Sequence, residues 1–105
     1  MSNPSIARAP YKLWTSNASQ LLASFVRDLK ALKSSPIYPR LKKLAFQDIP
    51  NYEAIDQIAN LKKLRGEDNA YRIRVGDYRI GLFIEAETIT FARVKHRREI
   101  YRNFP

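Results

Sequence analysis

The chain has no cysteine and a single histidine, His96, among its 105 residues. Without cysteine it can form no disulfide, perform no thiol catalysis and build no Cys/His zinc site. Long apolar runs are also missing. The N-terminal sequence MSNPSIARAP lacks the apolar core of a signal peptide, and no later stretch approaches the ~20 apolar residues of a membrane span. We therefore expect a cytoplasmic protein with no membrane partner, no metal and no cofactor.

Acidic residues are scarce relative to basic ones. Nineteen Lys and Arg stand against ten Asp and Glu, which leaves a formal net charge of +9. Such a surface attracts polyanions, with nucleic acid ahead of an anionic membrane, although basic surfaces also serve solubility. The length and the 45% hydrophobic content fit one folded domain with one modest core. We expect residues 1–105 to form that single domain, with residues 1–10 as a flexible arm.

The first half of the chain predicts one short strand and two helices. The segments are a strand at 11–15, a helix at 18–33 that Ser16 or Asn17 can cap, and a second helix from Pro36 to Phe46. Residues 47–60 are predicted to form a connection that breaks at Pro50 and contains one or two helical turns.

From Tyr71 onward apolar residues alternate along the chain, which is typical of β-strands. Residues 71–75 and 78–84 are predicted strands, joined by Gly76-Asp77 as a two-residue hairpin turn. That turn fixes the register, with Val75 facing Tyr78, Arg74 facing Arg79, and Arg72 facing Gly81. A third strand is predicted at 88–95. Its expected register places Thr90, Ala92, Val94 and His96 on the same side as the arginines.

Three arginines, Arg72, Arg74 and Arg79, therefore share one face of the predicted sheet with no acid among them. A like-charge pair such as Arg74 and Arg79 costs up to ~1 kcal/mol relative to neutral residues. One interpretation is a solvated face on which long side chains spread apart under salt screening. The other is a phosphate site, because guanidinium groups match phosphate oxygens. Gly81 favours the second interpretation, since a residue without a side chain leaves the face open to a ligand.

The C-terminal sequence VKHRREIYRNFP brings the histidine, a tyrosine and more cations to the end of the third strand. Metal-independent cleavage of RNA requires a group that takes the 2′-hydroxyl proton, a group that protonates the leaving 5′-oxygen, and cations around the phosphorane. His96, Tyr101 and the arginines could supply these groups. Each also has a structural interpretation, with His96 as a hydrogen-bonded surface residue and Tyr101 as a half-buried packing residue.

Three motifs, LKKLRG, YRIRVGDYRIGLFI and ITFARVKHRREIY, resemble the RelE/ParE superfamily of bacterial toxins from toxin–antitoxin systems. The resemblance covers residues 61–101. It implies an α+β fold in which two N-terminal helices pack on a small antiparallel β-sheet. RelE-like members are ribosome-dependent endoribonucleases that cut mRNA in the A site, whereas ParE-like members inhibit DNA gyrase.

For this chain the resemblance implies a RelE-type mRNA interferase whose partners are a cognate antitoxin protein, the ribosome and mRNA. Gyrase inhibition and non-catalytic RNA binding remain alternatives. The resemblance also implies the site residues. The catalytic set is Arg74, Arg79, His96, Arg97 and Tyr101, and the substrate-binding set is Arg72, Lys95, Arg98 and Arg102.

Within the catalytic set, Arg79 matches the phosphate-stabilising arginine of the superfamily. Tyr101 matches its C-terminal tyrosine, which orients or activates the nucleophile. The acid and the base are expected among Arg74, His96 and Tyr101. Some relatives instead use a glutamate as the base, at a place near Glu67 and Asp68.

Overall fold

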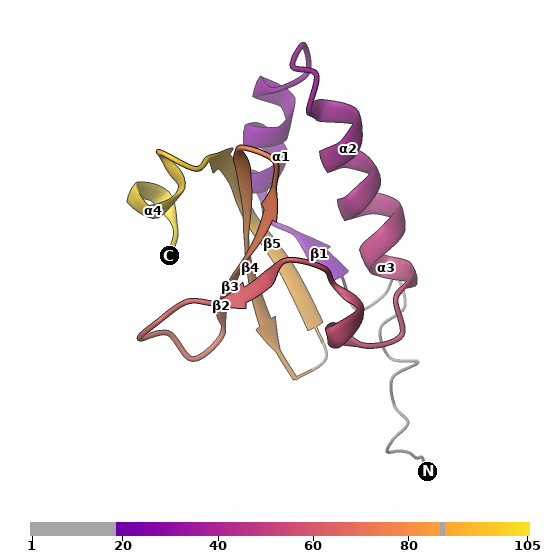
Figure 1. Cartoon of the computed structure of the whole chain (residues 1–105), viewed down its shortest axis with the longest axis vertical. Helices are drawn as coiled ribbons and strands as arrows, with labels where there is room; N and C mark the ends of the chain where they lie inside the picture. The colour runs from indigo at the N-terminus through magenta and orange to yellow at the C-terminus, as the bar shows by residue number, and fades with distance from the viewer. Residues whose placement is uncertain (1–18, 87) are drawn as a thin grey trace.

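The computed structural model describes residues 19–86 and 88–105 (Figure 1). The expected N-terminal arm, the strand at 11–15 and the caps at Ser16 and Asn17 lie outside the described residues. Among the helices that are described, none combines the length and the apolar character needed to cross a membrane.

A five-stranded sheet in the order β1-β5-β4-β3-β2 forms the centre of the molecule. The strands are β1 (Ser19–Leu21), β2 (Leu61–Lys63), β3 (Ala70–Val75), β4 (Tyr78–Glu85) and β5 (Thr88–His96). Strands β2 to β5 pair in antiparallel fashion, but β1 runs parallel to β5. The α+β class is confirmed, and the expectation of a purely antiparallel sheet is wrong because β1 adds a parallel pair at one edge.

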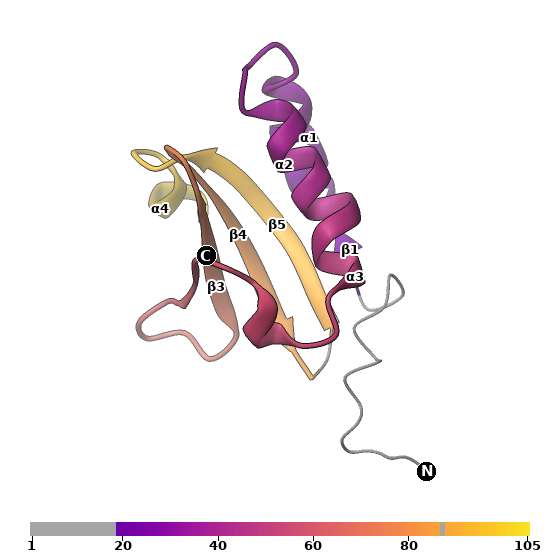
Figure 2. The same ribbon diagram turned by 45° about the vertical axis from the view of Figure 1, so that its right-hand side comes forward.

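The helices cover one face of this sheet (Figures 1 and 2). They are α1 (Ala23–Ala31), α2 (Tyr38–Lys43), the π-helical turn η4 (Leu44–Asp48), α3 (Ile49–Asn51) and the 3₁₀ turn η5 (Ile55–Gln57). Apolar residues of α1 to α3 and of the sheet form the main core, including the fully buried Phe25, Leu41, Ile49 and Phe91. The expectation that the helices are N-terminal is wrong. Strand β1 (Ser19–Leu21) pairs with Ile89–Phe91 of β5 before α1 begins at Ala23.

Pro50 does not break the second helix, contrary to the prediction from the sequence. Proline has no N–H, and in a regular α-helix its ring clashes with the carbonyl four residues earlier. Directly before Pro50, the Ile49 N–H bonds to the carbonyl of Leu44, five residues back. This wider π turn accommodates the proline, so the chain stays helical as far as Asn51. The helical turn expected in the following connection is confirmed as η5.

The predicted β3–β4 hairpin is confirmed pair by pair, including Arg74 opposite Arg79 and Arg72 opposite Gly81. Gly76 has a φ of 60°, a left-handed conformation that glycine adopts without strain. The predicted register of β5 is only half right. A bulge at Gly81/Leu82 leaves Ala92 without a direct partner on β4 and places Arg93 opposite Gly81.

This bulge changes which side chains of β5 face the helices. One extra residue reverses the alternation along the rest of a strand. Val94 therefore pairs with Ile80 and joins the main core, and His96 pairs with Tyr78. The expectation that Val94 and His96 share the arginine side is wrong.

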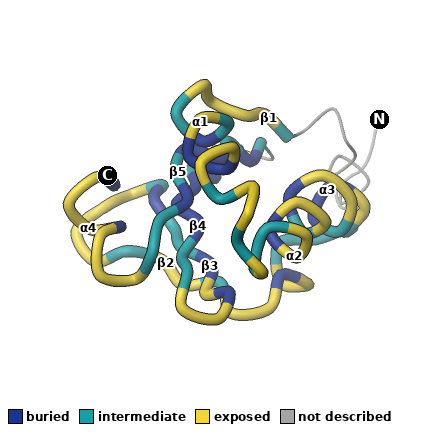
Figure 3. The backbone as a smooth tube through the Cα atoms, turned by 90° about the horizontal axis from the view of Figure 1, so that it is seen from above, coloured by how far each residue is buried: buried dark blue, intermediate teal, exposed yellow. Residues whose placement is uncertain are grey.

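The opposite face of the sheet carries a second, smaller core beneath a C-terminal helix, α4 (Ile100–Asn103), that was not predicted. Ala70, Ala92, Ile100 and Phe104 are buried there, with Leu64 and Phe83 packed against them. Seen from above, buried residues occupy the central strands and reappear at the ends of α4 (Figure 3). Gly81 does not leave this face open as expected, because the Phe104 ring packs directly on it.

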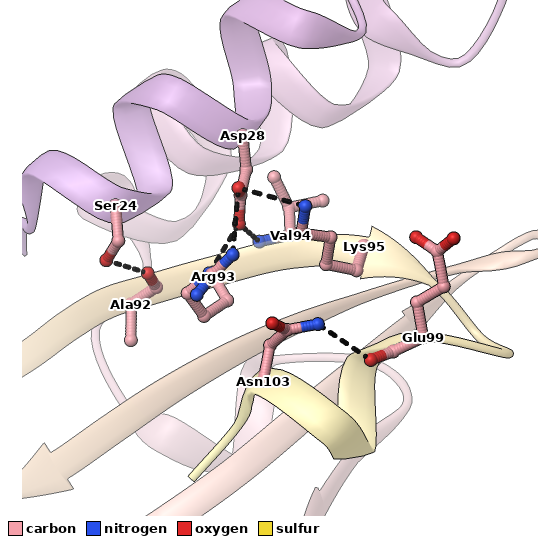
Figure 4. A network of polar contacts seen from close by, with 8 residues as sticks. All are labelled: Ser24, Asp28, Ala92, Arg93, Val94, Lys95, Glu99 and Asn103. Carbon is pink, nitrogen blue, oxygen red and sulfur yellow. Dashed lines mark hydrogen bonds and ion pairs between the residues drawn. The ribbon is translucent and has the colours of Figure 1, made fainter.

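Helix α1 supplies the hydrogen bonds along the edge of β5 where β1 ends (Figure 4). The Ser24 hydroxyl donates to the Ala92 carbonyl at 2.6 Å, and the Val94 N–H donates to Asp28 Oδ2 at 3.1 Å. Asp28, only 6% exposed, also accepts two hydrogen bonds from Arg93, at 2.7 and 3.2 Å, and lies 3.4 Å from Lys95 Nζ. One buried carboxylate thus joins α1 to the strand edge and pairs with two cations, which leaves the cluster one net positive charge.

We expect Asp28→Ala to lower the free energy of unfolding by about 3 kcal/mol, because it leaves a buried N–H and a partly buried guanidinium without their acceptor. Urea denaturation measures the loss. Asp48→Ala is the control, since the Asp48–Lys43 pair is exposed and should contribute less than about 1 kcal/mol. Equal losses in the two variants would contradict this account of the β5 edge.

Candidate nucleic-acid interface

Two rows of cations cross the sheet on the side away from the main core. In the first row Lys62 of β2 is opposite Arg72 of β3, followed by Gly81 and Arg93. In the second row Arg74, Arg79 and Lys95 lie opposite one another in turn. We call these six residues, Lys62, Arg72, Arg74, Arg79, Arg93 and Lys95, the basic face. No acidic residue occupies a position in either row.

Arg79 lies at the electrostatic centre of the basic face. Its partial burial lowers the pKa of the guanidinium, and the charge of Arg72 lowers that pKa further. Arg74 and Arg97 act in the same direction, and only Tyr101 opposes them. Arginine is charged in both the folded and the unfolded chain at neutral pH, so a lowered pKa means that its charge opposes folding there. A bound anion would reverse the effect.

Hydrogen bonds to the backbone hold the arginine side chains apart. Arg79 Nη1 donates to the carbonyls of Gly76 and Tyr78, both at 2.9 Å. Arg72 Nη1 donates to the Asn60 carbonyl at 3.1 Å, while Arg74 reaches only the Asn60 side chain at 3.5 Å. The arginines are therefore placed by neutral oxygens, and they keep their charge for a ligand.

An open hollow of about 920 Å³ adjoins the basic face, between the β2–β3 loop and α4. Arg72 and Tyr101 line it together with residues Lys62 to Asp68 of β2 and the loop. Tyr101 is 56% exposed. Tyr101 and Arg72 thus share one concave surface.

The other residues expected at the site are distributed unevenly. Arg97 stays near Arg79 and lies 3.9 Å from the carboxylate of Asp77, a residue of the hairpin turn. Lys95 is on the basic face, but its ammonium group is held by Asp28. Arg98 and Arg102 are exposed at the C-terminal end. The structure thus brings Arg72, Arg74, Arg79, Arg97 and Tyr101 together.

His96 is separated from that group. Its ring packs edge-on against Tyr78 with 5.5 Å between ring centroids, and its Nδ1 accepts a hydrogen bond from the Arg98 N–H. Tyr78 lies on the same face of β4 as the core residues Ile80 and Leu82, so the imidazole packed against it lies on the helix side of the sheet. The bulge in β5 is the cause.

Sequence reasoning missed the cations that β2 and its loop contribute. Lys62 and Arg65 line the hollow beside Arg72, together with Glu67 and Asp68, which the sequence had placed near the glutamate base of some relatives. The signal was the basic run LKKLRG, whose strand pairing with Arg72 could not be inferred without knowing that 61–63 is a strand. Asp28 was missed as well, although it falls on the buried side of α1 between Phe25 and Leu29.

Solved structures share this fold. A chain of the RelB–RelE antitoxin–toxin complex from Methanococcus jannaschii is 40% identical and superposes with a TM-score of 0.68, covering 82% of this chain and 99% of that one. A chain of the RelBE2 toxin–antitoxin complex from Mycobacterium tuberculosis is 26% identical, with a TM-score of 0.60 over 76% of this chain and 96% of that one. The fold is that of the RelE/ParE class.

The family follows from the sequence matches. A family model described as the ParE toxin of the type II toxin–antitoxin system parDE matches residues 13–101. Toxin RelE3 of Methanocaldococcus jannaschii is 42% identical over 83 residues, 78% of this chain and 92% of the relative. The chain belongs to the RelE/ParE superfamily and is a toxin of a type II toxin–antitoxin system, which confirms the resemblance seen in its motifs.

We expect Arg74→Gln to raise the melting temperature at low ionic strength. The change removes one charge of a like-charge pair, worth up to about 1 kcal/mol, and loses only the long contact to Asn60. The gain should vanish in 0.5 M salt, because the Debye length falls to about 4 Å there and the repulsion between the two guanidinium groups is screened. Thermal unfolding at two salt concentrations measures it. A variant less stable than wild type in both buffers would show that the arginines do not repel one another.

Proposed function

We propose that this toxin is a ribosome-dependent endoribonuclease that cleaves mRNA in the A site. The observation that carries the proposal is the pairing of Arg74 with Arg79 on the sheet, beside Arg72, which shares the hollow with the exposed Tyr101. The 42% identity to a protein named as a RelE toxin supports it. Action on ribosomes places the protein in the cytoplasm.

In the proposed reaction the 2′-oxygen of one nucleotide attacks the adjacent phosphorus. Its proton passes to a base, the P–O5′ bond breaks, and the leaving 5′-oxygen takes up a proton. The products are a 2′,3′-cyclic or 3′-phosphate end and a free 5′-hydroxyl. Because the nucleophile belongs to the substrate, the protein's task is to align the 2′-oxygen and to stabilise the added charge of the phosphorane.

The positions of the side chains suggest their roles. Arg79 stabilises the phosphorane, and Arg72 holds the phosphate at the edge of the hollow. Tyr101 hydrogen-bonds to the 2′-hydroxyl and orients it. Of the three expected proton carriers, Arg74 and Tyr101 lie near Arg79, and His96 does not. Glu67 and Asp68, carboxylates in the same hollow, are the further candidates for the base.

The remaining cations serve attraction over a longer range. Arg97, Arg98 and Arg102 extend the positive charge beyond the end of β5 and draw in the phosphates that flank the cleavage site. Lys95 contributes less than expected, because its ammonium group pairs with Asp28, whose carboxylate it shares with Arg93. A cognate antitoxin protein would hold the toxin inactive, as similar chains have been solved in RelB–RelE and RelBE2 complexes. Because the toxin carries a formal net charge of +9, an acidic segment of the antitoxin would complement this surface.

Inhibition of DNA gyrase is the second candidate, because the matching family model is described as a ParE toxin. That function needs no proton transfer. It therefore predicts gyrase-dependent DNA damage on expression, and a potency that does not change when Tyr101 loses its hydroxyl.

Cleavage of mRNA on programmed ribosomes tests the proposal. We expect Arg79→Ala to reduce the single-turnover rate by a factor of 10² to 10³, as the loss of one transition-state contact does in other enzymes. Tyr101→Phe should also slow cleavage, because it removes only the hydroxyl. Arg27→Ala is the matched control, an exposed arginine on α1 away from the basic face.

Three results of this assay have distinct meanings. Intact transcripts with the wild-type toxin would exclude the nuclease. Salt-sensitive RNA binding without cleavage or growth arrest would instead support a plain RNA-binding protein. If the cleavage rate fell as much in Arg27→Ala as in Arg79→Ala, the basic face would contribute only general charge attraction and not a specific contact.

We expect His96→Gln to leave the cleavage rate within about threefold of wild type, because the imidazole lies on the helix side of the sheet. The same ribosome assay measures it. A fall comparable to that of Arg79→Ala, in a variant with unchanged thermal stability, would mean that His96 reaches the substrate.

A further inference from the structure

Helix α4, which carries Tyr101, is held in place by two apolar side chains. Ile100, fully buried, precedes the tyrosine, and Phe104, 3% exposed, follows it. Both pack into the second core against the small residues Ala70 and Ala92. The helix has only four residues and no side-chain cap, so little else stabilises it.

The Phe104 anchor depends on a residue in the middle of the sheet. A Cβ at Gly81 would lie 2.6 Å from the Phe104 ring, so any larger residue would collide with it. The Phe104 ring also packs against the ring of Phe83, with 5.0 Å between the two ring centroids. Gly81 is also the gap in the first row of the basic face, between Arg72 and Arg93. The ring thus sits in the basic face itself.

The side chain of Tyr101 is not fixed by contacts of its own among the described residues. In residues 19–86 and 88–105 its side chain makes no hydrogen bond, and it is more than half exposed. The backbone bonds of α4 join it to the end of β5, from Glu99 N–H to the His96 carbonyl and from Arg102 N–H to the Glu99 carbonyl. The place of the phenol relative to Arg79 is therefore set by the anchors on either side.

We propose that Phe104, seated on Gly81, is a positioning residue that fixes the Tyr101 hydroxyl beside the arginines for cleavage. The proposal rests on the nuclease function proposed above. A phenol displaced by about 1 Å can lose as much as a hundredfold in rate, whereas binding of mRNA by the arginines does not need it. Loss of the anchor should thus affect the rate at saturation and spare the apparent affinity.

The experiment compares Phe104→Ala, Tyr101→Phe and the double variant in single-turnover cleavage on programmed ribosomes. Phe104→Ala should slow cleavage at saturating toxin at least tenfold, with the half-saturating toxin concentration within twofold of wild type. The double variant should be no slower than Tyr101→Phe alone, because Phe104 acts only through the tyrosine hydroxyl. Phe104→Leu, which keeps an apolar anchor, should recover most of the rate.

Gly81→Ala tests the same contact from the other side. The new methyl group displaces the ring while both Phe104 and Tyr101 remain, so the kinetic defect should match that of Phe104→Ala. Combining Gly81→Ala with Phe104→Ala removes the collision and should add no further loss. Phe46→Ala is the control, an aromatic residue 44% exposed on η4, and should cleave like wild type.

The outcomes separate this inference from the nuclease function. Additive losses of rate in the double variant, or a change only in the half-saturating toxin concentration, would overturn the positioning role of Phe104. Cleavage by the wild type would still support the nuclease function. A Tyr101→Phe variant that cleaves at the wild-type rate would also overturn the positioning role. Only an inactive wild type would remove both. Thermal unfolding of each variant, with Phe104→Leu folded like wild type, guards against a loss caused by unfolding.

Discussion

The carboxylate of Asp28 is the interaction on which the arrangement of the last strand depends. It accepts the Val94 N–H where β1 no longer pairs, and it binds Arg93 and Lys95 on either side. Directly before this point β5 has its bulge, which reverses the direction of every later side chain. Asp28 therefore stabilises the register that brings Arg93 and Lys95 to the basic face and turns His96 away from it.

The same carboxylate divides the basic face into two parts. Arg93 and Lys95 share the single negative charge of Asp28 at the β5 edge. Within the described residues, by contrast, Arg72, Arg74 and Arg79 donate only to backbone carbonyls and the Asn60 side chain. Repulsion is thus concentrated where the hollow opens and where Tyr101 lies. A concentration of charge that opposes folding is physically reasonable when a polyanion offsets it, and the RNA of the proposed function would be such a polyanion.

The sequence predicted the hairpin correctly because a two-residue turn and strict alternation leave one register. It could not predict the bulge in β5, which depends on contacts with Ser24 and Asp28 more than sixty residues away. It misjudged Gly81 for a related reason, since Phe104 fills that space from the far end of the chain. Local motifs proposed Arg72, Arg74, Arg79 and Tyr101, which the structure brings near one another. His96 was misplaced because its position depends on long-range pairing.

Binding of RNA phosphate by the basic face is the central claim, and NMR of the arginine Nε–H groups tests it most directly. The probe is a short RNA with a 2′-deoxy nucleotide at the cleavage position, which binds but cannot react. We predict that the Nε–H signals of Arg72 and Arg79 shift on titration, while that of Arg27 on α1 does not. Shifts confined to arginines of the helices, with Arg72 and Arg79 unmoved, would contradict the account.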